Sequence, residues 1–170
     1  MNWKEVEFTH DLPAVIRLMG SPGLLLTSVD AGGVPNTMAI GWGTPGIIWG
    51  RPIFTVLVRP SRYTFGHIEA TGEFVVSVPA EGMEDDVLHC GTASGRDEDK
   101  FAACDFTTTP GETVRVPLID QCVQHYECRV LHRNDIVDGA LDAEVREGCY
   151  PSGDLHRLYY GEILRTVVRA

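Results

Sequence analysis

Short runs of apolar and β-branched residues recur along the chain, separated by glycine, proline and acidic turn residues. Runs of this kind predict β-strands bounded by turns. The run Ile53–Val58 is apolar almost throughout, which is typical of a strand buried on both faces. Thr44–Gly46 breaks the extended pattern that precedes it. The predicted strands cover residues 24–29, 36–42, 47–49, 53–58, 73–79, 123–131 and 158–168, with a further candidate at 137–145.

Helical patterns are few and short. Ser61 is a suitable N-cap for a helix that runs to about Ala70 and ends at Thr71 and Gly72. Two more short helices are predicted at 82–89 and 97–104, the second with acidic residues at its amino end. Many strands with few helices argue against a doubly wound α/β fold. They favour a mainly β barrel with short helices over its openings.

Composition narrows the class of protein further. The chain has 170 residues without a repeat, low-complexity tract or linker, so a single domain covering residues 1–170 is expected. Its 14 Lys and Arg residues stand against 24 Asp and Glu residues, a formal net charge of −10. A nucleic-acid binder normally carries the opposite balance, because it must neutralise several phosphates. We therefore expect no nucleic-acid partner.

The apolar runs and the cysteines indicate the cellular compartment in which we expect the protein. No apolar run approaches the roughly 20 residues that span a bilayer, and the first residues lack the apolar stretch of a signal peptide. The five cysteines are odd in number, widely spaced and never arranged as C-x-x-C, which argues against zinc-ribbon and thioredoxin-type sites. We expect a cytoplasmic protein with reduced thiols and no membrane partner.

The segment Arg59–Thr64 joins a buried strand to a predicted helix. A helix N-terminus offers N–H groups without partners and a partial positive charge, and two arginines and two hydroxyls stand beside it here. A phosphate dianion requires such a set, and an acidic chain must supply it locally. An ordinary capped helix with solvated arginines is the alternative.

The segment Asn36–Gly43 is rich in small residues. They allow a flat ligand to approach the backbone of a strand, and Asn36 and Thr37 can hydrogen-bond the edge of a heterocycle. Trp42 can stack on a ring. Alternatively, the glycines ease the curvature of a barrel strand and the tryptophan fills the core.

Two later segments are weaker candidates. Arg96 and Lys100 would share one helix face if the helix at 97–104 forms, and would reach an anion together; the surrounding acids favour a solvated acidic surface instead. His156 precedes an aromatic strand, where it could stand at a pocket mouth or be structural. The chain lacks a dinucleotide fingerprint, a Walker A sequence, a nucleophile elbow and H-E-x-x-H. His125 and Cys128 would point to opposite faces of a strand, so no metal site is expected.

Six segments occur in one order with regular spacing, and together they resemble flavoredoxin and the wider flavin reductase-like family of FMN-binding split barrels. The resemblance covers about residues 20–165. The segments that carry it are Asn36–Trp42, Arg59–Thr64, Gly72–Ser77, Cys90–Phe101, Pro117–Ile119 with Glu127–Val130, and His156 with Tyr160–Ile163. In the last segment this chain has Tyr159-Tyr160 where family members often have phenylalanine or another apolar residue.

The resemblance implies a Greek-key split β-barrel, a homodimer and one FMN per subunit near the subunit interface. Position by position, it implies an isoalloxazine lined by Asn36, Thr37, Met38, Ala39 and Trp42. It implies a ribityl phosphate end held by Arg59, Ser61, Arg62, Tyr63 and Thr64. Further contacts implied by the resemblance come from Ser94, Arg96, Lys100, His156 and Tyr159.

Two main functions remain open at this point. The first is an oxidoreductase that takes electrons from NAD(P)H or a small redox carrier and passes them onward through bound FMN. The second is an FMN-binding electron carrier or flavin-storing protein without efficient turnover. Haem or metal binding on a similar barrel is a third reading, with no axial ligand evident in the sequence.

Overall fold

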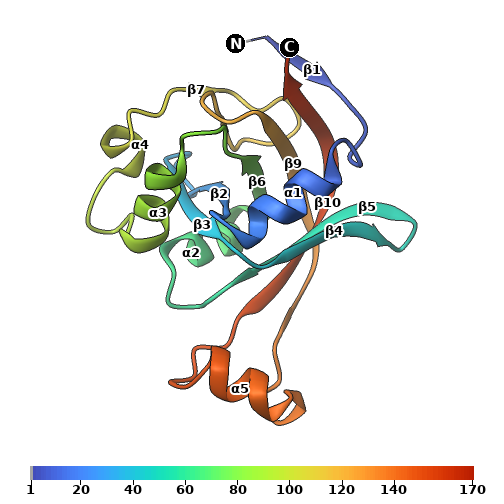
Figure 1. The fold of residues 1–170 in the computed structure, drawn as a ribbon, viewed down its shortest axis with the longest axis vertical. Helices are drawn as coiled ribbons and strands as arrows, with labels where there is room; N and C mark the ends of the chain where they lie inside the picture. The colour runs from blue at the N-terminus through green and yellow to red at the C-terminus, as the bar shows by residue number, and fades with distance from the viewer. Residues whose placement is uncertain (1) are drawn as a thin grey trace.

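The structure is a computed structural model that describes residues 2–170, and most of its regular structure is antiparallel β-strand (Figure 1). Apolar, β-branched segments form these strands because they can bury one or both faces in a shared core. The strands are β1 (Trp3–Glu5), β2 (Leu24–Val29), β3 (Pro35–Ile40), β4 (Gly43–Ile48), β5 (Arg51–Val58), β6 (Glu73–Val78), β7 (Thr108–Thr109), β8 (Leu118–Ile119), β9 (Gln124–Asp135) and β10 (Arg157–Arg169).

One sheet forms the body of the molecule. Its strands are hydrogen-bonded in the order β3-β2-β6-β9-β10-β5-β4, and β1 pairs with β10. Within residues 2–170 the two end strands, β3 and β4, are not bonded to each other, so the curved sheet stays open on that side. The fold class predicted from the sequence, a mainly β split barrel with a few short helices, is confirmed.

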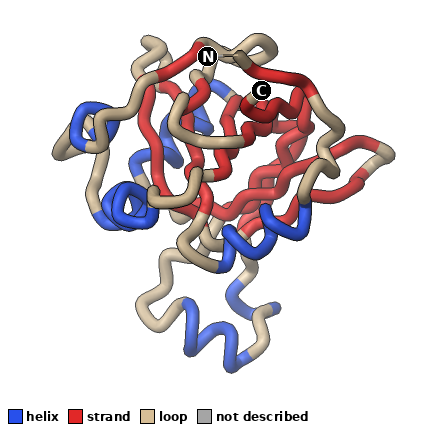
Figure 2. The backbone as a smooth tube through the Cα atoms, turned by 45° about the horizontal axis from the view of Figure 1, so that its top comes forward, coloured by secondary structure: helices blue, strands red, loops and turns tan. Residues whose placement is uncertain are grey.

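The helices lie around the sheet rather than within it (Figure 2). Helix α2 follows β5, as the pattern predicts, and α3 occupies the second predicted segment with its start two residues later. Helix α1 was not predicted; it buries Val15 and Met19, four residues apart, against the barrel. The helices are α1 (Leu12–Gly20), α2 (Tyr63–Thr71), α3 (Glu84–Thr92), α4 (Lys100–Ala103), the 3₁₀ helix η1 (Asp138–Ala140) and α5 (Ala143–Cys149).

Two predictions about where the chain is extended were wrong. Thr44–Gly46 lies inside β4 and does not break it; Pro45 is tolerated because β4 is an edge strand with one partner, β5. The candidate strand at 137–145 is instead η1 and the first half of α5. Asp142 caps α5 by accepting hydrogen bonds from the N–H groups of Glu144 and Val145, which favours helix over strand there.

The main core fills the barrel between β2, β5, β6, β9 and β10. Phe54, Phe74 and Tyr126 are fully buried in it. Gly161 is required at its position, because a Cβ there would lie 2.3 Å from the ring of Phe74. The pairing of β9 and β10 shifts register between Tyr160 and Gly161, next to this close approach. There are two smaller apolar clusters: one lies under α3 and α4, and the other lies beside β8.

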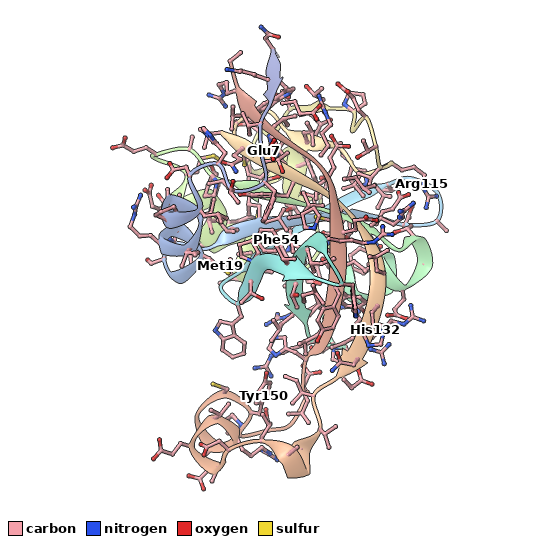
Figure 3. All side chains as sticks on the ribbon, turned by 90° about the vertical axis from the view of Figure 1, so that its right-hand side faces the viewer. Glu7, Met19, Phe54, Arg115, His132 and Tyr150 are labelled. Atoms are coloured by element: carbon pink, nitrogen blue, oxygen red, sulfur yellow. The ribbon has the colours of Figure 1, made fainter. Side chains whose placement is uncertain are left out.

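Residues 136–156 extend from the barrel between β9 and β10, and we call this segment the arm. It contains η1 and α5 and projects below the barrel in Figure 1. Figure 3 shows Tyr150 on the arm, well separated from Phe54 and Met19 in the body of the barrel. The arm matters for function because its carboxyl-terminal end returns to the start of α2.

Candidate functional site

Two adjoining cavities lie between β3, the start of α2 and the loop after α3. The first, of about 130 Å³, is lined mainly by polar groups. The second, of about 210 Å³, follows β3 toward the arm, and both cavities are lined by Met38 and Arg62. Together they reach the lower end of the ~300–1,000 Å³ typical of small-molecule sites. We refer to them as the anion cavity and the slot.

The anion cavity opens at the start of α2. The N–H groups of the first helical turn have no acceptor inside a helix, so those of Tyr63 and Thr64 can serve a ligand. The residue at the N-cap is Arg62, and no side chain caps the helix, so the prediction that Ser61 caps it was wrong. The Ser61 hydroxyl instead donates to the Asp154 carboxylate on the arm, at 2.5 Å.

Asn36 on β3 is fixed toward α2. Its side-chain amide donates to the Thr64 hydroxyl at 2.9 Å, and both side chains are buried. Gly95 packs directly on the Asn36 side chain, since a Cβ at this glycine would lie 2.0 Å from the Asn36 amide oxygen. The loop between α3 and α4 is thereby held against β3. Ser94 in the same loop accepts a hydrogen bond from the Arg96 N–H group at 3.2 Å.

Arg96 and Lys100 were predicted to share one helix face, and this prediction was wrong. Asp99 accepts hydrogen bonds from the N–H groups of Phe101 and Ala102, so α4 starts at Lys100 and Arg96 remains in the preceding turn. Both residues still line the anion cavity. The Arg96 guanidinium lies 5.2 Å from the centre of the Tyr63 ring and donates to the Ser61 carbonyl at 3.0 Å.

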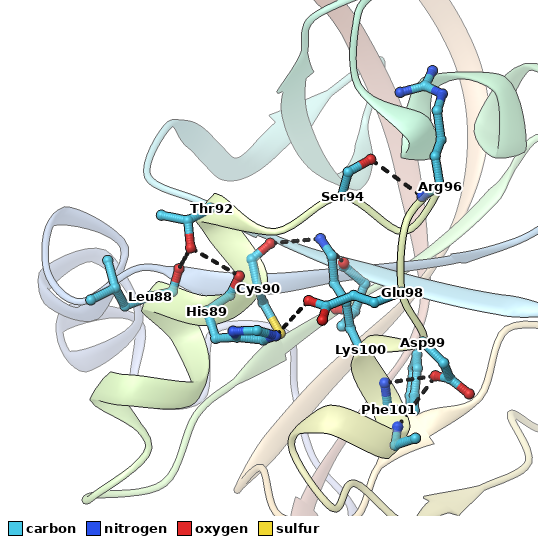
Figure 4. A network of polar contacts seen from close by, with 12 residues as sticks. Leu88, His89, Cys90, Thr92, Ser94, Arg96, Glu98, Asp99, Lys100 and Phe101 are labelled. Atoms are coloured by element: carbon cyan, nitrogen blue, oxygen red, sulfur yellow. Dashed lines mark hydrogen bonds and ion pairs between the residues drawn. The ribbon is translucent and has the colours of Figure 1, made fainter.

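Lys100 is 4% exposed and reaches under β3. Its ammonium donates to the carbonyls of Cys90 at 2.8 Å and Thr37 at 3.0 Å, and Figure 4 shows the bond to Cys90. Burial lowers the pKa of Lys100. An ammonium has three N–H donors, so one remains for a ligand in the anion cavity. Burial raises the pKa of the neighbouring Cys90 to about 12, so this thiol stays protonated near neutral pH.

The slot combines an apolar floor with aromatic side chains. Met38, Ala39 and Trp42 contribute from β3 and the turn after it. Trp42 is 43% exposed, and the centre of its ring lies 5.0 Å from that of the His156 ring and 6.1 Å from that of the Tyr150 ring. A flat ligand can therefore lie along the β3 backbone with an aromatic edge beside it.

His156 is held by the arm. The Tyr150 hydroxyl and His156 Nδ1 are 2.8 Å apart, which fixes the ring orientation. Burial, followed by the positive charge of Arg59, lowers the pKa of His156 to about 4. The imidazole is therefore neutral near pH 7 and can both accept and donate a hydrogen bond.

Arg59 does not project freely toward a ligand phosphate, although it lines the slot. Its guanidinium donates to the carbonyls of Cys149 at 2.9 Å, Asp154 at 3.1 Å and Gly153 at 3.4 Å. It also lies 5.0 Å from the centre of the Tyr150 ring. Arg59 therefore ties the arm to the barrel.

Two of the residues selected from the sequence present no side chain to these cavities. The Thr37 hydroxyl packs against β2, with the Thr27 hydroxyl and the Leu26 carbonyl, and only its carbonyl contacts the site through Lys100. Tyr159 is fully buried in the barrel core and donates to Glu69 at 2.7 Å. Tyr150 and Asp154 were not selected, because their roles depend on where the arm returns to the barrel.

The charged side chains that line the two cavities have the opposite sign to the net charge of the chain. Within residues 2–170, four cationic side chains line them and no carboxylate does: Arg59, Arg62, Arg96 and Lys100. The described residues contain no group of three or more His, Cys, Asp or Glu side chains placed to hold a metal ion. The arrangement suits a ligand with one anionic end and one flat, largely apolar end.

A family model described as "Flavin reductase like domain" matches residues 16–170. This chain belongs to the flavin reductase-like family. A protein of Archaeoglobus fulgidus is 34% identical over 132 residues, covering 78% of this chain, which spans only 64% of that relative's length. Escherichia coli YddH is 30% identical over 137 residues, covering 73% of this chain and 72% of YddH.

Solved structures of the family share the fold. Flavoredoxin of Desulfovibrio vulgaris superposes with a TM-score of 0.69 at 26% identity, covering 87% of this chain and 69% of its own. Flavoredoxin of Methanosarcina acetivorans gives a TM-score of 0.68 at 26% identity, covering 86% of this chain and 68% of that flavoredoxin.

Each helix in residues 2–170 of the present chain is too short or too polar to traverse a bilayer.

Proposed function

We propose that this protein binds FMN in the anion cavity and the slot, and that it acts as an FMN-dependent oxidoreductase of the flavin reductase-like family. The observation that carries the proposal is the concentration of four cations around two cavities of a chain with a net charge of −10. FMN combines a phosphate dianion with a flat ring system, which matches the two ends of the site.

The residues present fit this cofactor. The phosphate end would be held by the first turn of α2 with Arg62, Arg96 and Lys100, and the ring end by the slot. A single compact anion cavity supports FMN rather than FAD, because FAD carries a diphosphate and a second large group. The complete set of proposed contacts is Asn36, Met38, Ala39, Trp42, Ser61, Arg62, Tyr63, Thr64, Ser94, Arg96, Lys100 and His156, with Thr37 contributing through its backbone.

When bound, FMN supplies hydride or single-electron transfer, and the protein supplies orientation and electrostatics. Neutral His156 would offer a hydrogen bond at the mouth of the slot, and Trp42 would shield one edge of the ring from water. We propose NAD(P)H or a small redox carrier as a transient electron donor. The absence of a dinucleotide fingerprint is compatible with this, since a transient donor can dock against the ring without one.

A second candidate function, an electron carrier or flavin-storing protein, has one supporting observation. Structures named flavoredoxin stand among the most similar solved structures. The carrier would bind FMN in the same site but would turn over NAD(P)H poorly.

We also propose a homodimer. The arm exposes apolar side chains, with Val137 66% and Val145 44% exposed. Between the arm and the barrel lies an apolar cavity of about 290 Å³ bounded by Trp42, Leu57 and Ile136 among others. A second copy that covers these surfaces would remove them from water and shield the slot.

The first test identifies the cofactor. Protein reconstituted with excess FMN or FAD is desalted and denatured, and the released flavin is separated by chromatography. We expect FMN to be retained in about one equivalent per chain. Recovery of FAD in preference, or of no flavin at all, contradicts the proposal.

The second test separates enzyme from carrier. The reconstituted protein is mixed with NADH or NADPH without oxygen in a stopped-flow instrument, and bleaching of the flavin absorbance is followed. Bleaching within seconds supports the oxidoreductase. Negligible bleaching by both nucleotides, with prompt reduction by dithionite, supports the carrier.

A further inference from the structure

The Asp154 carboxylate occupies donors that a phosphate at the start of α2 would use. Its two oxygens accept from the Ser61 hydroxyl at 2.5 Å and, more weakly, from the Ser61 N–H group at 3.4 Å. These are the hydroxyl and the amide that precede the first turn of α2. An internal anion thus stands at the edge of the anion cavity.

The backbone delivers this carboxylate from a fixed position. The Asp154 carbonyl accepts from Arg59, which also holds two neighbouring arm carbonyls. Asp154 has a φ of +55°, in the left-handed region that asparagine and aspartate tolerate better than other residues with a side chain. The contact is therefore a product of the arm's return to the barrel, not of a freely moving surface side chain.

We propose that Asp154 is a specificity-determining residue of the flavin site, whose carboxylate competes with the FMN phosphate for the Ser61 donors and keeps the flavin exchangeable. This inference rests on the proposed function. Two anions near one set of donors repel each other, and phosphate must displace the carboxylate or accept fewer hydrogen bonds. Riboflavin has no phosphate, so Asp154 does not oppose its binding.

The test compares FMN and riboflavin binding in three proteins by flavin fluorescence titration. Asp154→Asn removes the charge and keeps both the size and the tolerance of the left-handed backbone. Glu147→Gln is the matched control, since it removes one exposed negative charge from the same arm outside the site. At low ionic strength we expect Asp154→Asn to lower the Kd of FMN about fivefold, the order given by one charge pair in water. Its Kd for riboflavin, and both Kd values of Glu147→Gln, should change by less than about twofold.

Two further readouts separate charge competition from a change in shape. The gain in FMN affinity should shrink at about 1 M salt, where the Debye length falls to about 3 Å. Ser61→Ala should weaken FMN binding about fivefold more in the Asp154→Asn background than in the wild type, because a neutral amide oxygen holds the Ser61 hydroxyl less strongly than a carboxylate does and the phosphate can compete for it.

The outcomes are distinguishable. An FMN affinity that is unchanged or lower in Asp154→Asn overturns the inference, as does an equal change for both flavins. Equal costs of Ser61→Ala in the two backgrounds also overturn it. Failure of the wild type to bind either flavin instead refutes the proposed function.

Discussion

Lys100 shows how one buried charge links the scaffold to the site. Its ammonium holds the carbonyls of Thr37 on β3 and Cys90 on α3, so the two elements that bound the anion cavity are fixed to each other. Burying an ammonium is costly unless it is hydrogen-bonded, and burial accordingly lowers the pKa of Lys100. A ligand anion that accepts the third N–H would offset part of that cost.

The Lys100→Met variant tests this role. We expect FMN to bind about tenfold or more weakly, because a hydrogen bond to a charged donor contributes about 1.5–3 kcal/mol. Riboflavin affinity should change by less than about twofold. Circular dichroism would first establish that the variant is folded, and both flavins would then be titrated by fluorescence. Equal weakening of the two flavins would show that Lys100 does not contact the phosphate.

His125 gives the fold an acid-sensitive position away from the site. It is fully buried beside Trp3, its Nδ1 lies 2.9 Å from the Ser77 hydroxyl, and burial lowers its pKa to about 3. The unfolded state binds a proton near pH 6.5, whereas the folded state does so only near pH 3. Stability from this group is therefore complete above about pH 6.5 and declines as the pH falls toward 3.

The free energy of unfolding should fall when the pH is lowered from 7 to 5. We expect this loss to be about 2 kcal/mol smaller in His125→Gln than in the wild type. Comparing the unfolding free energy of each protein at the two pH values removes any pH-independent cost of the substitution. Urea unfolding at both pH values measures it. His10→Gln, at an exposed position, is the control and should retain the wild-type pH dependence. A His125→Gln protein as acid-sensitive as the wild type would contradict the assignment.

At the scale of elements, the arm and α2 depend on each other. Arg59 lies between the end of β5 and the start of α2, yet its hydrogen bonds go to the carboxyl end of α5 and the turn after it. A planar guanidinium can serve several carbonyls at once, which a lysine ammonium on a shorter reach does less well. The position of His156 at the slot follows from this attachment.

Arg59→Lys should loosen the arm without unfolding the barrel. We expect amide hydrogen exchange in α5 to become about tenfold faster, which corresponds to the loss of one or two ordinary hydrogen bonds. Exchange in β6 and β9 should be unaffected. Arg115→Lys, which alters an arginine paired with Glu73 outside the arm, is the control. If exchange in α5 is the same in both variants, Arg59 does not hold the arm.

At the scale of the whole molecule, charge is unevenly distributed. The chain carries a formal net charge of −10, but the cations that line the two cavities create a local positive field. Such a field favours an anionic cofactor over other small molecules of similar shape. On the arm, Val137 and Val145 expose apolar side chains among charged residues.

We expect the protein to be a dimer at micromolar concentration, with a mass of twice one chain by light scattering. Val137→Asp should shift it toward the monomer, because a charge on an apolar contact surface must be desolvated on association. Ile16→Asp, at a residue 60% exposed on α1, is the matched control and should leave the mass unchanged. A wild type that elutes as a monomer with FMN tightly bound would contradict the proposed dimer.

Local sequence predicted most of the long strands, and together with the family resemblance it selected residues that line one cavity. Continuous apolar runs such as Ile53–Val58 predict buried strands because the burial requirement is local to the segment. Asn36, Thr64, Ser94 and Lys100 were selected from short segments, and the structure brings them together around one cavity. Asn36 lies near the start of β3, Thr64 and Lys100 lie in the first turns of α2 and α4, and Ser94 lies in the loop between α3 and α4.

The remaining features depend on contacts between distant segments. Asp142 caps α5 and so makes this part of the arm helical. The hydrogen bond from Ser61 to Asp154 fixes the end of the arm to the start of α2, and it links residues 93 positions apart. Arg59 and Tyr159 resembled site residues by position, but pairing across strands directs the first to the arm and the second into the core. Sequence periodicity reports which face of an element is buried. Only the tertiary structure decides which partner meets that face, because hydrogen bonds and packing across the barrel carry no local pattern.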